Sequence, residues 1–397
     1  MAFDLDKNTE YENEEDVKIV VFGVGGGGGN TVATMVDKKV TGVHYVIANT
    51  NTRDLDNKDK TKIQTIHLAK KKNEEREERL RGRRRVKVRG AGGHPGVGEE
   101  CAKDTLDEII AQIEDADMLF VAASMGGGTG TGAAPVVAQA AKEMGILTVG
   151  VATKPFNYEG SARMNVALEG IQKMRENVDA LIVIDDESVF KLKEYAGTSM
   201  NDMFKAVDDI LCKAVMGIID LIDADGFINV DFADVCSTLE DAGLAHMAIG
   251  HGKGENARKN AVDEVLHSPL LATSIDGAKR GLININIPKS FDVSEYQQLA
   301  TDISSRFNKD AFFKVGVVFD EELADDEISI IAIATDFDED VVDRVINNQT
   351  PASVDIGFPS FPAQGSVDVN AFQSFGSMSR DSETNAFMNA INNSKGR

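Results

Sequence analysis

The sequence predicts an α/β protein: a parallel sheet covered by helices on both faces, then one long central helix, then a second, smaller α/β domain. Strand patterns alternate strictly with helix patterns from Val17 to Asp186, which is typical of right-handed βαβ units. The pattern then becomes continuously helical over residues 200–223 and nearly apolar all round toward its end, as in a buried central helix. Three β-rich stretches follow, GLININIP, FKVGVVFD and ISIIAIATDF.

Each element of the first half has its own signature. The predicted strands are apolar runs bounded by glycine or polar residues: VKIVVFGVG, VHYVIANTN, ADMLFVAAS, ILTVGVAT and ALIVIDD. The predicted helices between them are TVATMVDKKV, EECAKDTLDEIIAQIEDA, PVVAQAAKEMG and VALEGIQKMRENV. In PVVAQAAKEMG, Pro135 falls in the first turn and Gly145 lies past the end, the favoured positions of these residues. This order predicts a Rossmann-like, doubly wound sheet.

Composition limits the classes of function. The chain has 397 residues and a net charge of −23, which argues against nucleic acid as a direct partner. No stretch is long and apolar enough for a transmembrane segment, and the acidic start is not a secretory signal. The three cysteines are far apart and the six histidines are scattered. We therefore expect a cytoplasmic protein with neither disulfides nor a protein-built metal site.

Two glycine-rich stretches follow two of the predicted strands, GVGGGGGN (Gly23–Asn30) and MGGGTGTGAAP (Met125–Pro135). In a parallel sheet both lie at the carboxyl edge, where such folds bind ligands. Glycine lets backbone N–H groups approach an anion, and a helix N-terminus behind adds a favourable dipole. Thr129 and Thr131 add hydroxyl donors. This chemistry suits the phosphates of a nucleotide.

Three kinds of nucleotide site compete for these loops. A P-loop requires a lysine after its glycines, and neither loop contains one. A dinucleotide site is matched formally by Gly23, Gly25 and Gly28, which leaves a nucleotide-dependent oxidoreductase as an alternative. However, ANTNT stands where an acid should hold the ribose, and the second loop would have no role. The third interpretation uses both loops on one phosphate chain.

The ordered set GVGGGGGN, RGAGGHP, MGGGTGTGAAP, TKPFNYEGSARM and NVDFADV resembles the FtsZ family of bacterial cell-division GTPases, in the tubulin superfamily. The resemblance runs from about Val17 to about Phe337. It implies a tubulin/FtsZ-like fold, GTP or GDP as the ligand with Mg²⁺ alongside, and head-to-tail homopolymers that form the division ring at the septum. A related filament with a role in cell shape or DNA positioning is the alternative within the superfamily.

The resemblance also implies which residues hold the nucleotide. Glu159 would accept hydrogen bonds from the ribose, and Arg163 would flank the sugar and phosphates, roles that suit a carboxylate and a guanidinium. Asp208 would accept from guanine N–H groups, which adenine lacks, and Phe204 would stack on the base. The phosphate cradle would be formed by Gly26, Gly27, Gly28, Gly29, Asn30, Gly126, Gly127, Gly128, Thr129, Gly130 and Thr131.

The resemblance assigns catalysis to NVDFADV, through Asn229, Asp231 and Asp234. In this family that loop meets the γ-phosphate of the neighbouring subunit in the filament. Phosphoryl transfer to water needs mainly positioning and charge stabilisation, which two carboxylates can supply by orienting water. GTP hydrolysis would then require assembly.

The resemblance divides the chain into named parts and also marks departures from the family. We expect a disordered acidic arm (1–16), a GTP-binding domain (17–199), a central helix (200–223), a C-terminal GTPase-activating domain (224–347) and a flexible tail (348–397). A basic insertion is expected at about 66–89. The family commonly has Pro-Asn-Asp where this chain has Asp185, Asp186 and Glu187. The tail only faintly echoes the peptide that docks membrane-tethering and division partners.

Overall fold

The computed structural model describes residues 17–69, 90–199, 202–222, 227–271, 278–304, 311–320 and 323–337. Several sequence predictions fall outside the described residues: the N-terminal arm, positions 70–89 of the basic insertion and the tail from residue 338. The first positions assigned to the insertion are described, and they complete a strand, β3 (Ile63–His67), that the sequence did not predict.

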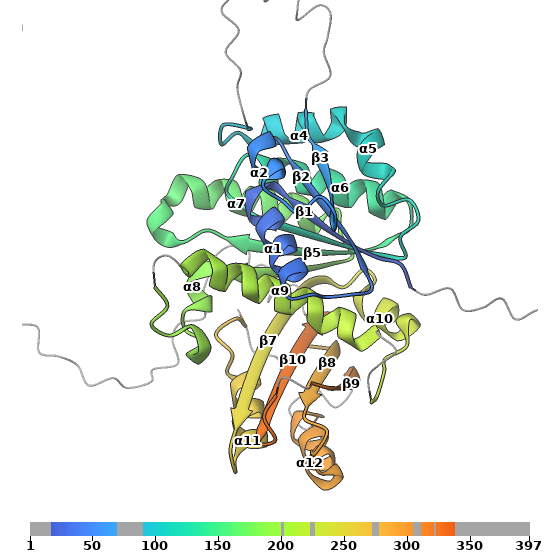
Figure 1. Ribbon diagram of the computed structural model, residues 1–397, viewed down its shortest axis with the longest axis vertical. Coiled ribbons are helices and arrows are strands. Elements are labelled where there is room, and N and C mark those ends of the chain that lie inside the picture. Colours follow the sequence, from blue (N-terminus) through green and yellow to red (C-terminus); the bar gives the residue numbers. More distant parts are fainter. Residues whose placement is uncertain are drawn as a thin grey trace, which may run out of the picture. The chain divides into compact units, whose positions relative to one another are not determined.

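The first half forms a sheet of six parallel strands in the order β3-β2-β1-β4-β5-β6 (Figure 1). Besides β3, its strands are β1 (Ile19–Val24), β2 (Val43–Asn49), β4 (Met118–Ser124), β5 (Leu147–Lys154) and β6 (Ala180–Asp185). The helices and 3₁₀ turns of this half are α1 (Gly25–Asp37), α2 (Thr52–Asp56), α4 (Pro95–Asp104), α5 (Leu106–Ile110), α6 (Thr129–Glu143), η1 (Asn157–Glu159), α7 (Ser161–Arg175), α8 (Asp186–Val189) and η2 (Lys193–Tyr195). The predicted parallel α/β architecture is confirmed.

Helices cover both faces of this sheet, as the unbroken apolar strands require. Successive residues of β1 point to opposite faces: Val21 packs with α1 and α9 (Met203–Ile222), whereas Phe22 packs with α4, α5, α6 and α7. All six residues of β1 are buried. With both faces covered, the segments that leave the carboxyl edge of the sheet are where such folds bind a ligand.

The long helix α9 lies between the first sheet and the strands of the second half (Figure 1). Ile210 and Ile218 are fully buried there, in one cluster with residues of both halves. The second half consists of α10 (Phe232–Leu239), β7 (Gly243–Lys253), α11 (Ala257–Leu266), β8 (Arg280–Ile287), α12 (Val293–Ser304), β9 (Phe312–Phe319) and β10 (Glu327–Thr335). The predicted central helix and second α/β unit are confirmed.

The second half is joined to the first through the sheet as well as through packing on α9. Strand β7 pairs in parallel with β6, with Ala180 opposite Gly243 and Ile182 opposite Ala245. β10 then pairs antiparallel with β7 and β8, and β8 pairs in parallel with β9. In the part of the chain that the structure describes, one sheet of ten strands therefore runs through both halves.

The four helices predicted in the first half all have different bounds: α1 and α7 begin earlier than expected, at Gly25 and Ser161, and the other two differ as follows. The single helix expected over residues 99–116 is wrong: α4 ends at Asp104 and α5 begins at Leu106, because Thr105 leaves helical geometry and its hydroxyl donates to the Cys101 carbonyl at 2.7 Å. Pro135 was expected in the first turn of its helix, but α6 already begins at Thr129 and Pro135 lies inside it. No helix within the described ranges is long and apolar enough to cross a membrane.

Candidate functional site

The two glycine-rich stretches lie side by side at the carboxyl edge of the sheet. They leave β1 and β4, which are neighbouring parallel strands with Val24 opposite Ala123. A Cβ on Gly25 would lie 2.9 Å from the backbone nitrogen of Gly130, and one on Gly28 would overlap the carbonyl oxygen of Ala122. Only glycine permits this approach of the two backbones. The predicted juxtaposition of two glycine turns is thus present.

Much of this glycine-rich sequence forms first helical turns instead of the expected loops. α1 begins at Gly25, and α6 begins at Thr129 directly after Gly128. A third helix, α4, begins beside them, since a Cβ on Gly128 would lie 2.8 Å from the backbone nitrogen of His94, the N-cap of α4. Three helix N-termini with unsatisfied backbone N–H groups therefore converge, an arrangement that favours an anion.

Six of the eight glycines assigned to a phosphate cradle fall into two groups, whereas Gly27 and Gly126 each face a side chain, that of Ser124 and that of Arg163. Gly28, Gly29, Gly128 and Gly130 are buried, and a side chain on any of them would meet a neighbouring strand or turn. Nothing lies within 4 Å of a Cβ built on Gly26 or on Gly127. The buried glycines let the turns pack, and Gly26 and Gly127 leave open space in front of the backbone.

The two threonines of the second turn have structural partners. The Thr131 hydroxyl oxygen accepts a hydrogen bond from the Gly126 N–H at 2.9 Å, and Thr131 is buried. The hydroxyl of Thr129 lies 2.6 Å from that of Thr50, at the end of β2. Thr131 thus shapes the turn, while Thr129 ties it to the adjoining strand. Thr50 was not among the predicted site residues.

Glu159 and Arg163, predicted to contact the sugar, form an ion pair with each other at 2.8 Å. Glu159 lies in η1 and also accepts from the Phe156 backbone N–H at 3.1 Å. Arg163 lies in the first turns of α7, where its side chain passes the second glycine turn: a Cβ on Gly126 would lie 2.8 Å from its Cγ. The structure therefore brings this pair to the glycine turns.

An exposed aromatic cluster adjoins this pair. Phe204 of α9 and Tyr158 of η1 are 56% and 64% exposed, and both contact the buried ring of Phe156, with centroid distances of 6.1 and 5.1 Å. Exposed rings held in place by a buried one offer flat apolar faces on which a base can stack. The stacking role of Phe204 stays a prediction, and its ring is exposed as that role requires.

Asp208 lies one turn after Phe204 in α9. Burial raises the pKa of Asp208 to about 7, against the opposing effects of the Lys58 charge and a hydrogen bond from Thr31. Lys58 also donates to the Asn30 side chain at 3.0 Å. Lys58 thus links the predicted base-binding carboxylate to the first glycine turn. Sequence reasoning missed it, because it follows α2, an element that was not predicted.

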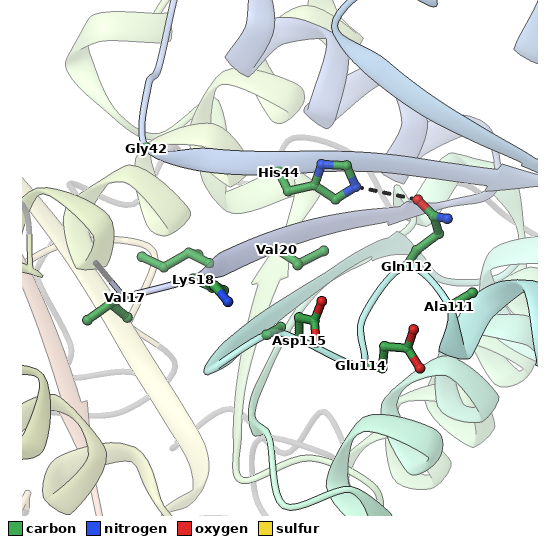
Figure 2. Close-up of a pocket in the computed structure, with 11 residues that line it drawn as sticks. Val17, Lys18, Val20, Gly42, His44, Ala111, Gln112, Glu114 and Asp115 are labelled. Atoms are coloured by element: carbon green, nitrogen blue, oxygen red, sulfur yellow. Dashed lines mark hydrogen bonds between the residues drawn. The ribbon is translucent and has the colours of Figure 1, made fainter. Parts of the chain in front are cut away.

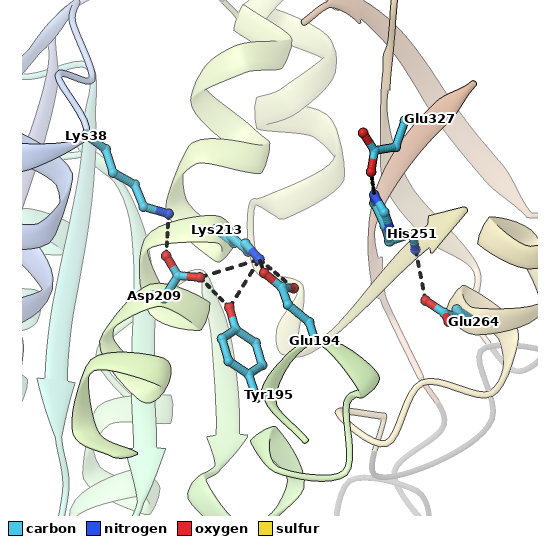
Figure 3. A network of polar contacts seen from close by, with 8 residues as sticks. All are labelled: Lys38, Glu194, Tyr195, Asp209, Lys213, His251, Glu264 and Glu327. Carbon is cyan, nitrogen blue, oxygen red and sulfur yellow. Dashed lines mark hydrogen bonds and ion pairs between the residues drawn. The ribbon is translucent and has the colours of Figure 1, made fainter. Parts of the chain in front are cut away.

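The adjacent Asp209 has a different environment (Figure 3). Burial raises its pKa, but the hydrogen bonds from Lys38 and Tyr195 outweigh that effect, so the net pKa is lowered. Lys213 completes the network, 3.4 Å from Asp209 and 2.6 Å from Glu194. Because Asp209 is held in this network, Asp208 is the carboxylate of the pair that is available to a ligand.

The predicted catalytic residues lie at the other end of α9. The Val230 N–H donates to the Leu221 carbonyl at 3.0 Å, which places the Asn229–Asp231 segment beside the last turn of this helix. At 1.5 Å per residue, Asp208 and Leu221 are about 20 Å apart along the axis. Asn229, Asp231 and Asp234 are therefore separated from the nucleotide-binding candidates of the same chain.

Asp231 and Asp234 are held at the start of α10, and not in a loop as expected. Asp231 is the N-cap residue and accepts from the Ala233 N–H at 3.3 Å. Asp234 lies in the first turn and forms an ion pair with Lys314 of β9 at 2.7 Å. Both carboxylates are thus presented at fixed positions on a rigid element.

Two cavities lie away from these residues. A cavity of about 680 Å³ is lined by Lys18, His44 and Gln112, at the amino ends of β1 and β2 and hence at the edge opposite the glycine turns (Figure 2). A second, of about 980 Å³, lies between α9 and strands of the second half and is lined by Lys213 and His251 (Figure 3). Neither includes a residue predicted to bind nucleotide.

Comparison with known proteins agrees with this geometry. The model of the Tubulin/FtsZ family GTPase domain matches residues 18–194, and that of the FtsZ family C-terminal domain matches residues 243–338. Cell division protein FtsZ 1 of Methanocaldococcus jannaschii is 38% identical over 82% of this chain and 85% of its own.

Solved structures give the same relationship. An empty FtsZ dimer from M. jannaschii is 37% identical, with a TM-score of 0.72 over 82% of this chain and 90% of that chain. CetZ2 of Haloferax volcanii, in a GTPγS-bound protofilament, is 19% identical with a TM-score of 0.62 over 84% and 97%, a similarity of fold alone. Both FtsZ domain models match in order, and a relative of 38% identity is covered over 85% of its length. The chain therefore belongs to the tubulin/FtsZ family, as an FtsZ with a GTPase domain.

Proposed function

We propose that this protein binds GTP at the paired glycine turns, assembles head to tail into filaments at the division site in the cytoplasm, and hydrolyses GTP between subunits. The observation that carries the proposal is the separation along α9. Asp208 lies near its start and the Asn229–Asp231 segment beside its end, about 20 Å away. The aspartates of the same subunit are too far away to reach a nucleotide held beside Asp208. In the proposed filament, the aspartates of the neighbouring subunit reach it instead.

The described residues fit a guanine nucleotide. The open space at Gly26 and Gly127 lies beside three helix N-termini, which supply N–H donors and favourable dipoles to phosphate. Glu159 and Arg163 adjoin the second turn on the sugar side, and Asp208 with Phe204 lies on the base side. A carboxylate accepts from the N1–H and amino group of guanine, and adenine has no such donor pair.

Mg²⁺ would accompany the nucleotide, held mainly by phosphate oxygens and water, as this ion usually is. Among the residues that the structure describes, no group of three or more His, Cys, Asp or Glu side chains is arranged to hold a metal by itself. When bound, the ion would offset phosphate charge. Asp231 and Asp234 of the next subunit would orient the attacking water.

Head-to-tail contact through two different surfaces forms an open filament when the rotation between subunits does not close a ring. This is consistent with the name of one relative's structure, an FtsZ dimer. The FtsZ relationship, at 38% identity, favours a role in cell division over one in cell shape or DNA positioning. Membrane-tethering partners would have to use the tail, which lies outside the described residues.

Assembly is tested by sedimentation and light scattering with GTP, with GDP and without nucleotide. GTP is expected to produce sedimenting polymer whose amount falls as GTP is consumed, because hydrolysis at the contact removes the γ-phosphate that helps to form it. Equal sedimentation in all three conditions would refute nucleotide-dependent assembly. The oxidoreductase alternative requires the protein to bind NADH. A titration with NADH that shows no binding would exclude it.

The catalytic assignment is tested by a matched pair of variants. Asp234→Ala and Lys314→Ala each break the same 2.7 Å ion pair, but only the first removes the carboxylate. Asp234→Ala is expected to bind GTP normally and lose GTP turnover, and Lys314→Ala is expected to retain turnover. If both variants lose turnover equally, the ion pair matters and the carboxylate has no separate role.

A further inference from the structure

Asp186 is a buried carboxyl group with an unsatisfied oxygen. It is the first residue of α8, directly after β6, and only 6% of the residue is exposed. Thr153 at the end of β5 donates to it, but its Oδ1 atom has no hydrogen-bond partner among the residues that the structure describes. A buried polar atom without a partner destabilises the protein, so a ligand that supplies the partner would gain affinity.

Asp186 also lies close to residues that flank the candidate nucleotide site. Its charge interacts with Glu159 on the sugar side and with Asp208 on the base side, although these two lie on η1 and α9. The unpartnered Asp186 carboxyl is therefore close both to the residue assigned to the ribose and to the residue assigned to the base.

The charged groups around Asp186 are predominantly acidic. Asp185 of β6 and Glu187 of α8 flank it in sequence, and η1 adds Glu159 together with the phenol of Tyr158. The nearby cations are committed elsewhere: Lys154 of β5 lies 3.6 Å from Asp185, and Arg163 lies 2.8 Å from Glu159. Ionisation of Asp186 would thus add one more negative charge to a buried, acidic surrounding.

We propose that Asp186 binds the guanine base as a neutral carboxylic acid, donating its O–H to an acceptor atom of the base while ionised Asp208 accepts from the base's N–H groups. This inference rests on the proposed function. A neutral carboxylic acid carries one donor and one acceptor, as a side-chain amide does, whereas an ionised one only accepts. Guanine offers both kinds of group, so two carboxyl groups in opposite protonation states would match it.

Burial favours the neutral state required of Asp186, and Asp208 is mainly ionised only above pH 7. Burial raises the pKa of Asp186 to about 8, with further contributions from Asp185, Glu159 and Asp208. At pH 7 the group is mainly neutral. Above pH 8 it ionises and repels the acceptor atom that it should contact. Because Asp208 must be ionised as well, and its pKa is raised to about 7, affinity should be highest between pH 7 and 8 and fall about fivefold between pH 7 and pH 9.

The experiment is calorimetric titration of the full-length protein with GDP at pH 7, 8 and 8.5, in two buffers of different ionisation enthalpy. At pH 8.5 about three quarters of the free Asp186 groups are ionised, so binding should take up at least about half a proton. Asp186→Asn keeps a donor that does not titrate, and it should bind GDP without this proton uptake. Asp185→Asn keeps an N-cap side chain but removes a charge that raises the pKa of Asp186, so it should still take up protons on binding GDP, beginning at a lower pH than the wild type.

Loss of protons from the base itself affects all three proteins equally, so the difference between them reports on Asp186. Wild-type binding with no proton uptake, or with the same uptake as Asp186→Asn, would overturn the inference while leaving the proposed function intact. If the wild type binds no GDP at any pH, the proposed function itself fails. The wild-type measurement alone decides the matter if Asp186→Asn does not fold.

Discussion

Substituting Gly26 with alanine separates ligand binding from folding. A Cβ at Gly26 meets nothing within 4 Å, and the residue lies in the first turn of α1 without left-handed backbone geometry. Gly26→Ala should therefore raise the unfolding free energy by about 0.5–1 kcal/mol, because alanine loses less backbone entropy on folding. The same methyl group would occupy space that a phosphate oxygen needs, about 2.9 Å from a backbone nitrogen.

Gly28→Ala is the matched control. Its Cβ would lie 2.0 Å from the Ala122 carbonyl oxygen, whereas real Cβ atoms do not approach closer than 3.0 Å. Backbone must then move by about 1 Å, and overpacking of this kind costs typically about 1–3 kcal/mol. Gly28→Ala should therefore lower the unfolding free energy.

The assays are urea unfolding without nucleotide and titration with GDP. Gly26→Ala should unfold at a higher urea concentration than the wild type, yet bind GDP at least about tenfold more weakly, a loss of about 1.4 kcal/mol. GDP binding at wild-type affinity by Gly26→Ala would refute the assignment of the phosphates to this turn.

Three other substitutions test separate contacts. Lys58→Ala removes the charge that lowers the pKa of Asp208, so GDP titrations should show a larger loss of affinity at pH 6.5 than at pH 7.5; an equal loss would mean that Lys58 acts independently of Asp208. Burial lowers the pKa of His246 from 6.5 to about 4. The contribution of the neutral side chain to the unfolding free energy is therefore complete above pH 6.5 and decreases as the pH falls toward 4. His246→Leu should therefore lose about 2–3 kcal/mol less unfolding free energy than the wild type between pH 7.5 and 4.5 in urea, and equal losses would contradict this. Thr131→Val leaves the Gly126 N–H without its acceptor and should lower the unfolding free energy by about 1–3 kcal/mol; an unchanged urea midpoint would show that water or backbone replaces the hydroxyl.

Most of the fold could be predicted because its strands are continuous apolar runs. Strands β1 and β4 are buried on both faces, and such strands have a clear composition. Strand β7 was missed because its sequence, GLAHMAIGHGK, is rich in alanine and glycine, which are depleted in strands. Strand β3 was missed because it is short and directly precedes the basic segment.

The candidate site could be predicted only where its residues are consecutive in the sequence. The glycine turns were recognised, but their division into packing positions and open positions depends on the neighbouring strand, as at Gly28 and Ala122. The contact between Thr50 and Thr129 joins residues 79 positions apart, and that of Lys58 with Asn30 also depends on the tertiary fold. Asp234 was expected in a loop because the next helix was expected to begin after NVDFADV, whereas α10 begins inside this motif, at Phe232.

The most direct test of the central claim is the GTPase activity per mole of protein, measured from dilute to concentrated protein at saturating GTP. Asp208 lies near the start of α9, and Asp231 and Asp234 lie beside its end, so on the proposed assignment a lone subunit contains no complete site. Activity per mole is expected to be near zero below a threshold concentration and to rise above it as filaments form. A constant activity per mole across the whole range would show that one chain hydrolyses GTP by itself, and would contradict the account.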